Sequence, residues 1–196
     1  AIEYGGTVDK YIGDAIMIFF GDPNSNGTKN DAIACVSMAL RMKKALRGLR
    51  KNWKSAGLSE SLHVRMGIHT DVCTVGNFGS LDRLDYTVLG NGVNLASRLE
   101  GIAKPNTILI SDSTYNIIKE EIDCTASEEV KVKGKLQPVK TYKVNDVLSG
   151  HRNTDIFYED EGFLLNIEES KITNVDLIIE NLKKSILKLK SNKREK

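Results

Sequence analysis

An aspartate follows a glycine between two short apolar runs near the start of the chain. The segment GGTVDKYIGD spans residues 5–14 and places Lys10 four positions before Asp14. A hard cation such as Mg²⁺ prefers carboxylate oxygens together with substrate phosphates, and an aspartate at a hairpin tip exposes its carboxylate. Residues four apart on an extended strand share a face, so Lys10 and Asp14 could act together. A turn aspartate and an edge-strand lysine are the structural alternative.

A second candidate site lies in the segment GNGVNLASR, residues 90–98. If a helix begins after the Gly-Asn-Gly turn, Asn94 and Arg98 are i and i+4 and share a face. The free N–H groups at such a helix start attract an anion, and the Arg98 guanidinium could stabilise charge developing on a phosphate. The alternative is a capping asparagine and a surface arginine.

Alternating lysines surround a glycine in the segment KVKGK, residues 131–135. They could contact phosphate as point charges, or protect an edge strand from aggregation. His69 ends an expected strand, where a core or turn histidine is more common than a ligand. Because His63 and His151 have no clustered partner residues, we predict no zinc site.

Composition excludes several classes of protein. With 196 residues, of which 40% are hydrophobic and 28% charged, one domain plus an appendage is expected. A net charge of +2 excludes bulk attraction to nucleic acid or to a membrane. No apolar stretch approaches the roughly 18 to 20 residues that a membrane span requires. The three cysteines, Cys35, Cys73 and Cys124, are far apart and favour a reduced, intracellular domain over a disulfide scaffold.

The apolar patterns predict alternating strands and helices. Runs at 7–12 and 15–20 flank Gly13-Asp14 and predict a hairpin, and helical periodicity extends from 31 to about 51. The helix at 93–100 is expected to have Asn91 as N-cap and Gly101 as its end. Further strands are expected at 62–69, 72–75, 85–89, 107–110, 127–132 and 139–144, and a helix at 112–121. This order indicates an α+β or mixed α/β fold with helices packed on a sheet.

The composition changes after residues 148–150. Acidic and aromatic residues at 155–161 are expected to form a linker, followed by a helix from 173 to about 190. Apolar residues of that helix alternate at four-three spacing over about two heptads, fewer than the three or four that indicate a coiled coil.

Taken together, the motifs resemble the catalytic domain of class III nucleotidyl cyclases of the adenylyl type. The resemblance runs in order from residue 1 to about 144. It is carried by GGTVDKYIGD (5–14), RMGIHT (65–70), VGNFG (75–79), DYTVLGNGVNLASR (85–98) and VKGK (132–135). It implies an α+β, ferredoxin-like cyclase fold over residues 1–147, with a mixed or antiparallel sheet, packed helices and no N-terminal strand. Residues 148–196 are then an acidic linker and a C-terminal amphipathic helix.

The resemblance also implies a role for each matched residue. Asp14 corresponds to a metal-binding aspartate, and Lys10 and Thr87 to the pair that reads the purine. An ammonium and a hydroxyl suit the N1 acceptor and N6 amino donor of adenine, so ATP is expected over GTP. Asn94 is expected to orient the ribose and Arg98 to stabilise the transition state. Lys133 is expected to contact the triphosphate.

The implied reaction is attack of the ribose 3′-hydroxyl on the α-phosphorus of ATP, which gives cyclic AMP and pyrophosphate in signal transduction. Two Mg²⁺ or Mn²⁺ ions are expected to assist. In this family the metal aspartates come from one chain and the residues matching Asn94 and Arg98 from the other. A chain with both sets implies a head-to-tail homodimer with two equivalent sites. We expect a cytoplasmic protein, or the cytoplasmic part of a membrane or multidomain protein, with no nucleic-acid partner.

Two departures from the family pattern bear on activity. The other metal aspartate lies upstream in the family, and only Asp9 precedes Asp14 here, so we expect a fragment or a naturally shortened relative. Asp71 stands where the family usually has glycine, and Asp71 or Asp9 could replace the missing ligand. An inactive cyclase-like module for dimerisation or nucleotide binding is therefore the alternative. An RNA-binding ferredoxin-like sheet is disfavoured, since the strands lack aromatic pairs that stack bases.

Overall fold

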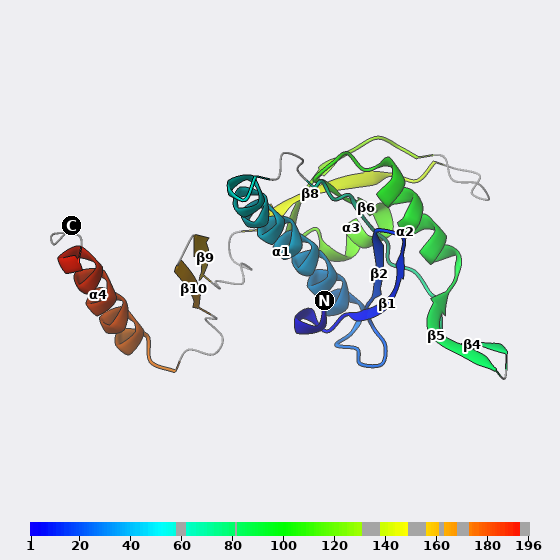
Figure 1. The fold of residues 1–196 in the computed structure, drawn as a ribbon. Coiled ribbons are helices and arrows are strands. Elements are labelled where there is room, and N and C mark those ends of the chain that lie inside the picture. The colour runs from blue at the N-terminus through cyan, green and yellow to red at the C-terminus, as the bar shows by residue number, and fades with distance from the viewer. Residues whose placement is uncertain are drawn as a thin grey trace. The chain divides into compact units, whose positions relative to one another are not determined.

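The computed structural model describes residues 1–57, 62–80, 82–130, 138–148, 156–160, 163–167 and 173–192. The chain divides into two units, Ala1–His151 and Arg152–Lys196, both drawn as ribbons in Figure 1. All the candidate site residues lie in the first unit.

A four-stranded mixed sheet is the centre of the first unit. Its strands follow the order β3 (Met66–Ile68), β6 (Ile108–Ser111), β8 (Thr141–Val147) and β7 (Ile122–Ala126). β3 pairs with β6 in parallel, whereas β8 is antiparallel to both β6 and β7. A mixed sheet with packed helices confirms the expected α+β class.

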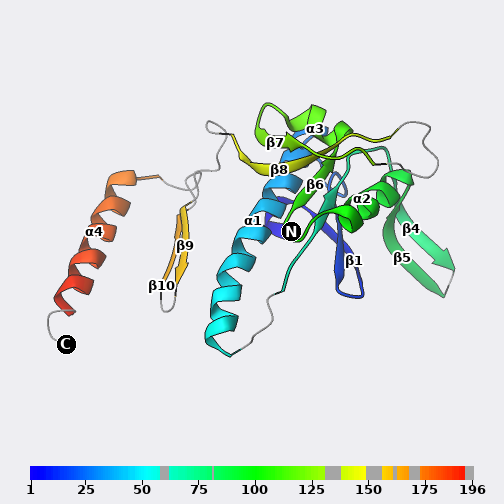
Figure 2. The ribbon, with the colours of Figure 1, turned by 90° about the horizontal axis from the view of Figure 1, so that it is seen from above.

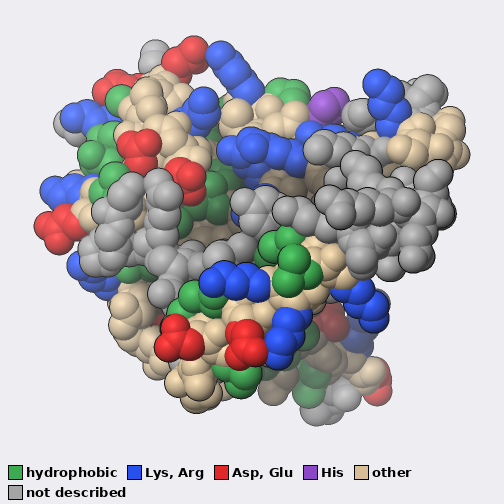
Figure 3. All heavy atoms as spheres, turned by 90° about the vertical axis from the view of Figure 1, so that its left-hand side faces the viewer, with side chains coloured by type: hydrophobic (Ala, Val, Ile, Leu, Met, Phe, Trp, Pro, Cys, Tyr) green, Lys and Arg blue, Asp and Glu red, His purple; other side chains and the backbone are tan. Residues whose placement is uncertain are grey.

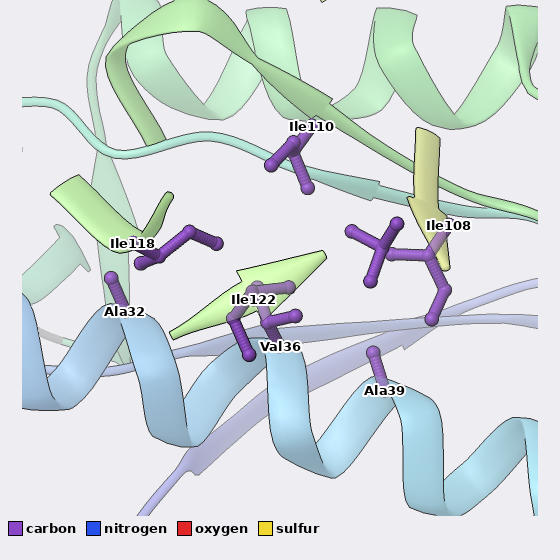
Figure 4. Packing of buried hydrophobic residues seen from close by; sticks show 8 residues of the cluster. Ala32, Val36, Ala39, Ile108, Ile110, Ile118 and Ile122 are labelled. Atoms are coloured by element: carbon purple, nitrogen blue, oxygen red, sulfur yellow. The ribbon is translucent and has the colours of Figure 1, made fainter. Parts of the chain in front are cut away.

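Helices cover both faces of this sheet. Because successive strand side chains point to opposite faces, Ile108 and Ile110 of β6 join the cluster of α1 (Thr28–Ser55) and α3 (Asp112–Ile118). Leu109 instead packs with α2 (Asn91–Ile102). Figure 4 shows the larger cluster, in which side chains from α1, α3, β6, β7 and β8 meet; its buried members are Ala32, Val36, Ala39, Ile108, Ile110, Ile118, Ile122 and Val144.

Two antiparallel hairpins stand outside this sheet. β1 (Thr7–Ile12) pairs with β2 (Ala15–Phe19), and β4 (Thr74–Ser80) pairs with β5 (Arg83–Leu89). The β4–β5 hairpin projects from the body of the unit in Figures 1 and 2. A short 3-10 helix, η1 (Ile2–Tyr4), precedes β1. The first hairpin was predicted with nearly these bounds, because a glycine-containing turn between two apolar runs is a strong local signal.

Several expected bounds are wrong, and for β4 the pairing with β5 explains why. α2 begins at Asn91, after Gly90 with φ 156°, so Asn91 is within the helix and does not cap it; Gly101 also lies within the helix. β4 runs through Gly76 and Gly79 because every residue from Thr74 to Ser80 pairs with β5. The strand expected at 127–132 is wrong for residues 127–129, which follow β7 and lie outside any strand, and Val130 forms only a bridge with Val139. Residues 131 and 132 lie outside the described residues.

The second unit contains a hairpin and a helix. β9 (Ile156–Asp160) pairs with β10 (Phe163–Ile167), so residues 156–160 form a strand where a linker was expected, and residues 155 and 161 lie outside the described residues. Aromatic and β-branched residues in these two runs favour strands over a linker. α4 (Val175–Asn192) confirms the expected C-terminal helix, and its apolar residues Val175, Leu177, Ile179, Ile186 and Leu187 are exposed.

Charges of both signs share the surface. On the face drawn in Figure 3, Lys and Arg side chains lie among Asp and Glu side chains, in keeping with the small net charge. The three cysteines are free thiols. None of the helices in the described ranges is both long enough and apolar enough to cross a bilayer.

Candidate active site

Lys10 and Thr87 lie on different hairpins and are joined by Asp9. The Thr87 hydroxyl, on β5, donates to Asp9 Oδ2 at 2.7 Å. The other carboxylate oxygen, Oδ1, lies 3.6 Å from Lys10 Nζ. The Asp9 side chain is only 1% exposed, whereas the Lys10 side chain is 43% exposed. The Lys10 ammonium is therefore partly exposed to solvent, whereas the Asp9 carboxylate that it contacts is buried. Thr87, the other partner of that carboxylate, is 5% exposed.

A bulge in β1 explains why two consecutive residues serve one site. Val8 pairs with Ile18 and Lys10 with Met17, so Asp9 is an extra residue between two consecutive positions of β2. In a regular strand, Asp9 and Lys10 would point to opposite faces. A bulge re-aims side chains and is common beside active sites.

Further contacts hold the two hairpins together. Tyr86 of β5 donates its hydroxyl hydrogen to the Asp22 carboxylate, and its ring packs against Phe19 with centroids 6.4 Å apart. Thr7 Oγ1 donates to the carbonyl of Asp22 at 2.7 Å. The relative placement of Lys10 and Thr87 therefore depends on several contacts between β1, β2, the segment after β2 and β5.

Asp14 occupies the turn of the first hairpin. β1 ends at Ile12 and β2 begins at Ala15, so Asp14 follows Gly13, whose φ is 63°. Asp14 is exposed. It lies beyond the strand, so the argument that Lys10 and Asp14 share one strand face does not apply to it.

Asn94 and Arg98 are both exposed on α2, as the i, i+4 spacing predicts. The opposite face of the helix buries Leu95 and Leu99 against Leu109 of β6. Gly67 of β3 also touches the helix backbone. A β-carbon at Gly67 would lie 2.2 Å from Glu100 N and 2.3 Å from the Ala96 carbonyl oxygen.

Gly67→Ala is expected to lower the free energy of unfolding by about 2 to 3 kcal/mol, because the added methyl meets backbone atoms that cannot rotate away. Urea denaturation measures this loss. The matched control is Gly48→Ala within α1, where nothing lies within 4 Å of the added carbon. The control is expected to stabilise by up to about 1 kcal/mol. Equal effects of the two substitutions would contradict the close approach of β3 and α2.

The loop after β3 supports the start of α2. A β-carbon at Gly92 would lie 2.8 Å from Asp71 Cβ and 3.1 Å from Cys73 Sγ, so these side chains occupy the space beside the first turn. Asp71 Oδ2 is 3.4 Å from His69 Nε2, and His69 Nδ1 lies 2.7 Å from Ser111 Oγ. Burial and the Asp71 carboxylate raise the pKa of the Cys73 thiol, which keeps it neutral. His69 is thus a packed core residue, as the sequence suggested.

Lys133 lies outside the described residues, as does the rest of VKGK. The structure therefore brings Lys10 and Thr87 together through Asp9, places Asn94 and Arg98 on one helix face, and sets Asp14 on a hairpin turn. The sequence analysis considered Asp9 only as a replacement metal ligand and missed its contacts with Thr87 and Lys10. No local pattern could have indicated this role, because it depends on the pairing of β1 with β2 and on Thr87 of β5.

The donor set fits a metal that arrives with a phosphate substrate. Among the residues that the structure describes, no group of three or more His, Cys, Asp or Glu side chains could enclose an ion. Asp14 is exposed, and Mg²⁺ is commonly held by one or two carboxylates plus substrate phosphates and water. The Asp9 carboxylate is buried and engaged by Thr87 and Lys10, so it is not free to serve as the metal ligand that the sequence analysis considered.

Exposed apolar side chains gather on the two hairpins. They include Tyr11 at 72%, Ile12 at 58% and Ile16 at 52% exposed on the first hairpin, and Leu84 at 60% and Leu89 at 48% on the second. Contiguous apolar patches of this kind can mark surfaces that bind another macromolecule, whereas apolar side chains exposed singly are normal.

The chain is similar in sequence and fold to known proteins. The family described as "Adenylate and Guanylate cyclase catalytic domain" matches residues 7–146. An adenylate cyclase of Anabaena cylindrica is 36% identical over 151 residues, which are 72% of this chain but 28% of that protein. The chain thus spans little more than a quarter of this curated relative.

Two solved structures share the fold. The adenylyl cyclase CyaB from P. aeruginosa is 50% identical, with a TM-score of 0.72 and 74% of each chain covered. The guanylyl cyclase Cya2 is 32% identical, with a TM-score of 0.70, and the match covers 77% of this chain and 75% of that one. The similar structures therefore include cyclases named for either purine.

Proposed function

Because the chain belongs to the family of adenylate and guanylate cyclase catalytic domains, we propose that it is an adenylate cyclase that converts ATP to cyclic AMP and pyrophosphate. The observation that favours ATP over GTP is that Lys10 and Thr87 both contact the Asp9 carboxylate. An ammonium donor and a hydroxyl acceptor match the N1 and N6 groups of adenine. The 50% identity to an adenylyl cyclase adds support.

The proposed reaction is an intramolecular transfer of the α-phosphoryl group. A bond forms between ribose O3′ and the α-phosphorus, and the bond from that phosphorus to the bridging oxygen of the β-phosphate breaks. The hydroxyl proton goes to solvent and pyrophosphate leaves. Asn94 holds the ribose so that O3′ faces the phosphorus, and positioning of this kind accounts for much of the rate. Arg98 stabilises the negative charge that grows on the phosphate oxygens.

Asp14 is the carboxylate that would hold a divalent ion, and Lys133 is proposed to contact the triphosphate. Two Mg²⁺ or Mn²⁺ ions, when bound, would supply charge neutralisation and a lower pKa for the 3′-hydroxyl. The carboxylate of Asp14 suits this task because it is exposed at a turn.

We further propose that the site forms between two copies of the chain, arranged head to tail. The exposed apolar residues on the two hairpins offer a surface for the second copy. In this arrangement Asp14 of one copy completes the site that holds Lys10, Thr87, Asn94 and Arg98 of the other. A twofold dimer then has two equivalent sites.

The test is to incubate the purified chain with Mn²⁺ and either ATP or GTP and to quantify each cyclic nucleotide. Cyclic AMP as the main product is the expected result. Cyclic GMP in excess over cyclic AMP would overturn the choice of ATP over GTP. If neither product forms from the chain or from the chain extended upstream, while 3′-deoxy-ATP still binds, the inactive nucleotide-binding module becomes the better description.

A further inference from the structure

The hydrogen bond between Thr87 and Asp9 determines what Thr87 can offer to a purine. A threonine hydroxyl has one hydrogen to donate, and a carboxylate is an acceptor only. Thr87 Oγ1 lies 2.7 Å from Asp9 Oδ2, so its hydrogen is already used. What remains on the oxygen is a lone pair, and Thr87 can only accept from a ligand.

The same carboxylate fixes the neighbouring donor. Lys10 Nζ lies 3.6 Å from Asp9 Oδ1, and an ammonium carries three hydrogens and no acceptor. At least two hydrogens stay available for a ligand. Asp9 thus sets an acceptor and a donor side by side, with its own carboxylate 1% exposed and out of reach of the ligand.

This pattern distinguishes the two common purines at their 6 and 1 positions. Adenine presents an amino donor at C6 and an acceptor at N1, and both find complementary groups. Guanine presents a carbonyl acceptor at C6 and an N–H donor at N1, so both positions would oppose the site. A site that leaves buried polar groups unpaired with the wrong substrate discriminates strongly.

We propose that Asp9 is a specificity-determining positioning residue: by holding the Thr87 hydroxyl hydrogen and the Lys10 ammonium, it restricts the site to 6-aminopurine nucleoside triphosphates. This inference rests on the proposed function and on the purine role proposed there for Lys10 and Thr87. The bulge at Asp9 supports it independently, because an extra residue in β1 turns Asp9 toward the side chains that it positions.

The main experiment compares kcat/KM for ATP and for GTP in Asp9→Asn. The asparagine amide can donate to Thr87 Oγ1, which frees the threonine hydroxyl to donate outward to a 6-carbonyl. The ATP-to-GTP ratio is expected to fall by at least about tenfold, with a gain for GTP. A merely structural role would lower both values together, because the ratio within one sample does not depend on the folded fraction.

Matched variants separate this effect from charge loss elsewhere. Asp123→Asn removes an exposed carboxylate on β7 that accepts from Asn145, and it is expected to keep the wild-type ratio. Thr87→Ser keeps the hydroxyl and is expected to retain most of the discrimination. Thr87→Val removes the hydroxyl and is expected to lose the discrimination between ATP and GTP. This variant keeps the inference testable if Asp9→Asn does not fold. An unchanged ratio in Thr87→Val would overturn the inference.

The wild-type protein offers a test that needs no substitution and no turnover. Titration calorimetry with 3′-deoxy-ATP and 3′-deoxy-ITP compares a 6-amino with a 6-oxo purine, and the 6-amino compound is expected to bind at least about tenfold tighter. Equal affinities would overturn the inference. If the wild type makes neither cyclic nucleotide, the proposed reaction fails while this comparison still reports the purine preference. If the wild type makes cyclic AMP and the Asp9 and Thr87 variants keep the wild-type ratio of kcat/KM for ATP to that for GTP, only the inference about Asp9 fails.

Discussion

Arg98→Ala is expected to lower kcat for cyclisation by about 100- to 1,000-fold while changing nucleotide affinity less than about threefold. Negative charge grows on the phosphate oxygens as the new bond forms, so the Arg98 guanidinium stabilises the transition state more than the bound ATP. Product formation under saturating ATP gives kcat, and calorimetric titration with 3′-deoxy-ATP gives the affinity.

Arg47→Ala is the matched control, because Arg47 is an exposed arginine on α1, away from the proposed site elements. It is expected to leave kcat unchanged within about twofold, as surface substitutions usually do. A loss of affinity in Arg98→Ala equal to its loss of kcat would mean that Arg98 binds the ground state and the transition state alike.

Asp14→Asn is expected to lower kcat by at least about 100-fold, and a higher Mn²⁺ concentration is expected to restore only part of it. The amide keeps the size of the side chain but removes the charge that a divalent ion requires. A rate titration with Mn²⁺ at fixed ATP measures both quantities. Because Asp14 is exposed in a turn, the thermal unfolding midpoint is expected to stay near the wild-type value. A wild-type Mn²⁺ dependence in this variant would remove Asp14 from the metal site.

Mixing the two inactive variants tests the shared site directly. In a head-to-tail heterodimer of Arg98→Ala and Asp14→Asn, one site carries both substitutions and the other carries neither. With random pairing, half of the dimers are mixed, so about a quarter of the wild-type activity is expected to return. No recovery after co-refolding would show that Asp14 and Arg98 serve the same site from one copy. Exclusion chromatography of each variant alone provides the control for dimer formation.

Local signals predicted much of the fold. The β1–β2 hairpin follows from Gly13-Asp14 between apolar runs, and a helix over most of α2 follows from the Gly-Asn-Gly turn before it and Gly101 near its end. The placement of Asn94 and Arg98 on one exposed helix face needs only this helical period. Those parts of the site could be placed because each depends on a few neighbouring residues.

Contacts between distant segments account for the rest. The bulge at Asp9 is a shift in the pairing register of β1 and β2. The role of Asp9 also depends on Thr87, which lies 78 positions away in the sequence. The length of β4 depends on its pairing with β5, which carries the strand across Gly76 and Gly79. Spacing within one segment carries no information about such partners. The resemblance gave roles to Lys10 and Thr87, but it did not supply the carboxylate between them.

The residues proposed to read the purine lie on hairpins that, as far as the structure describes them, contribute no residue to the two main hydrophobic clusters. Every buried member of those clusters comes from α1, α2, α3, β6, β7 or β8, or, for Ala103, from the residue after α2. Lys10 and Thr87 are on β1 and β5. Selection can therefore change the base that the site accepts while the scaffold keeps its packing. A family built on this plan is able to diverge in its second messenger with few compensating changes in its core.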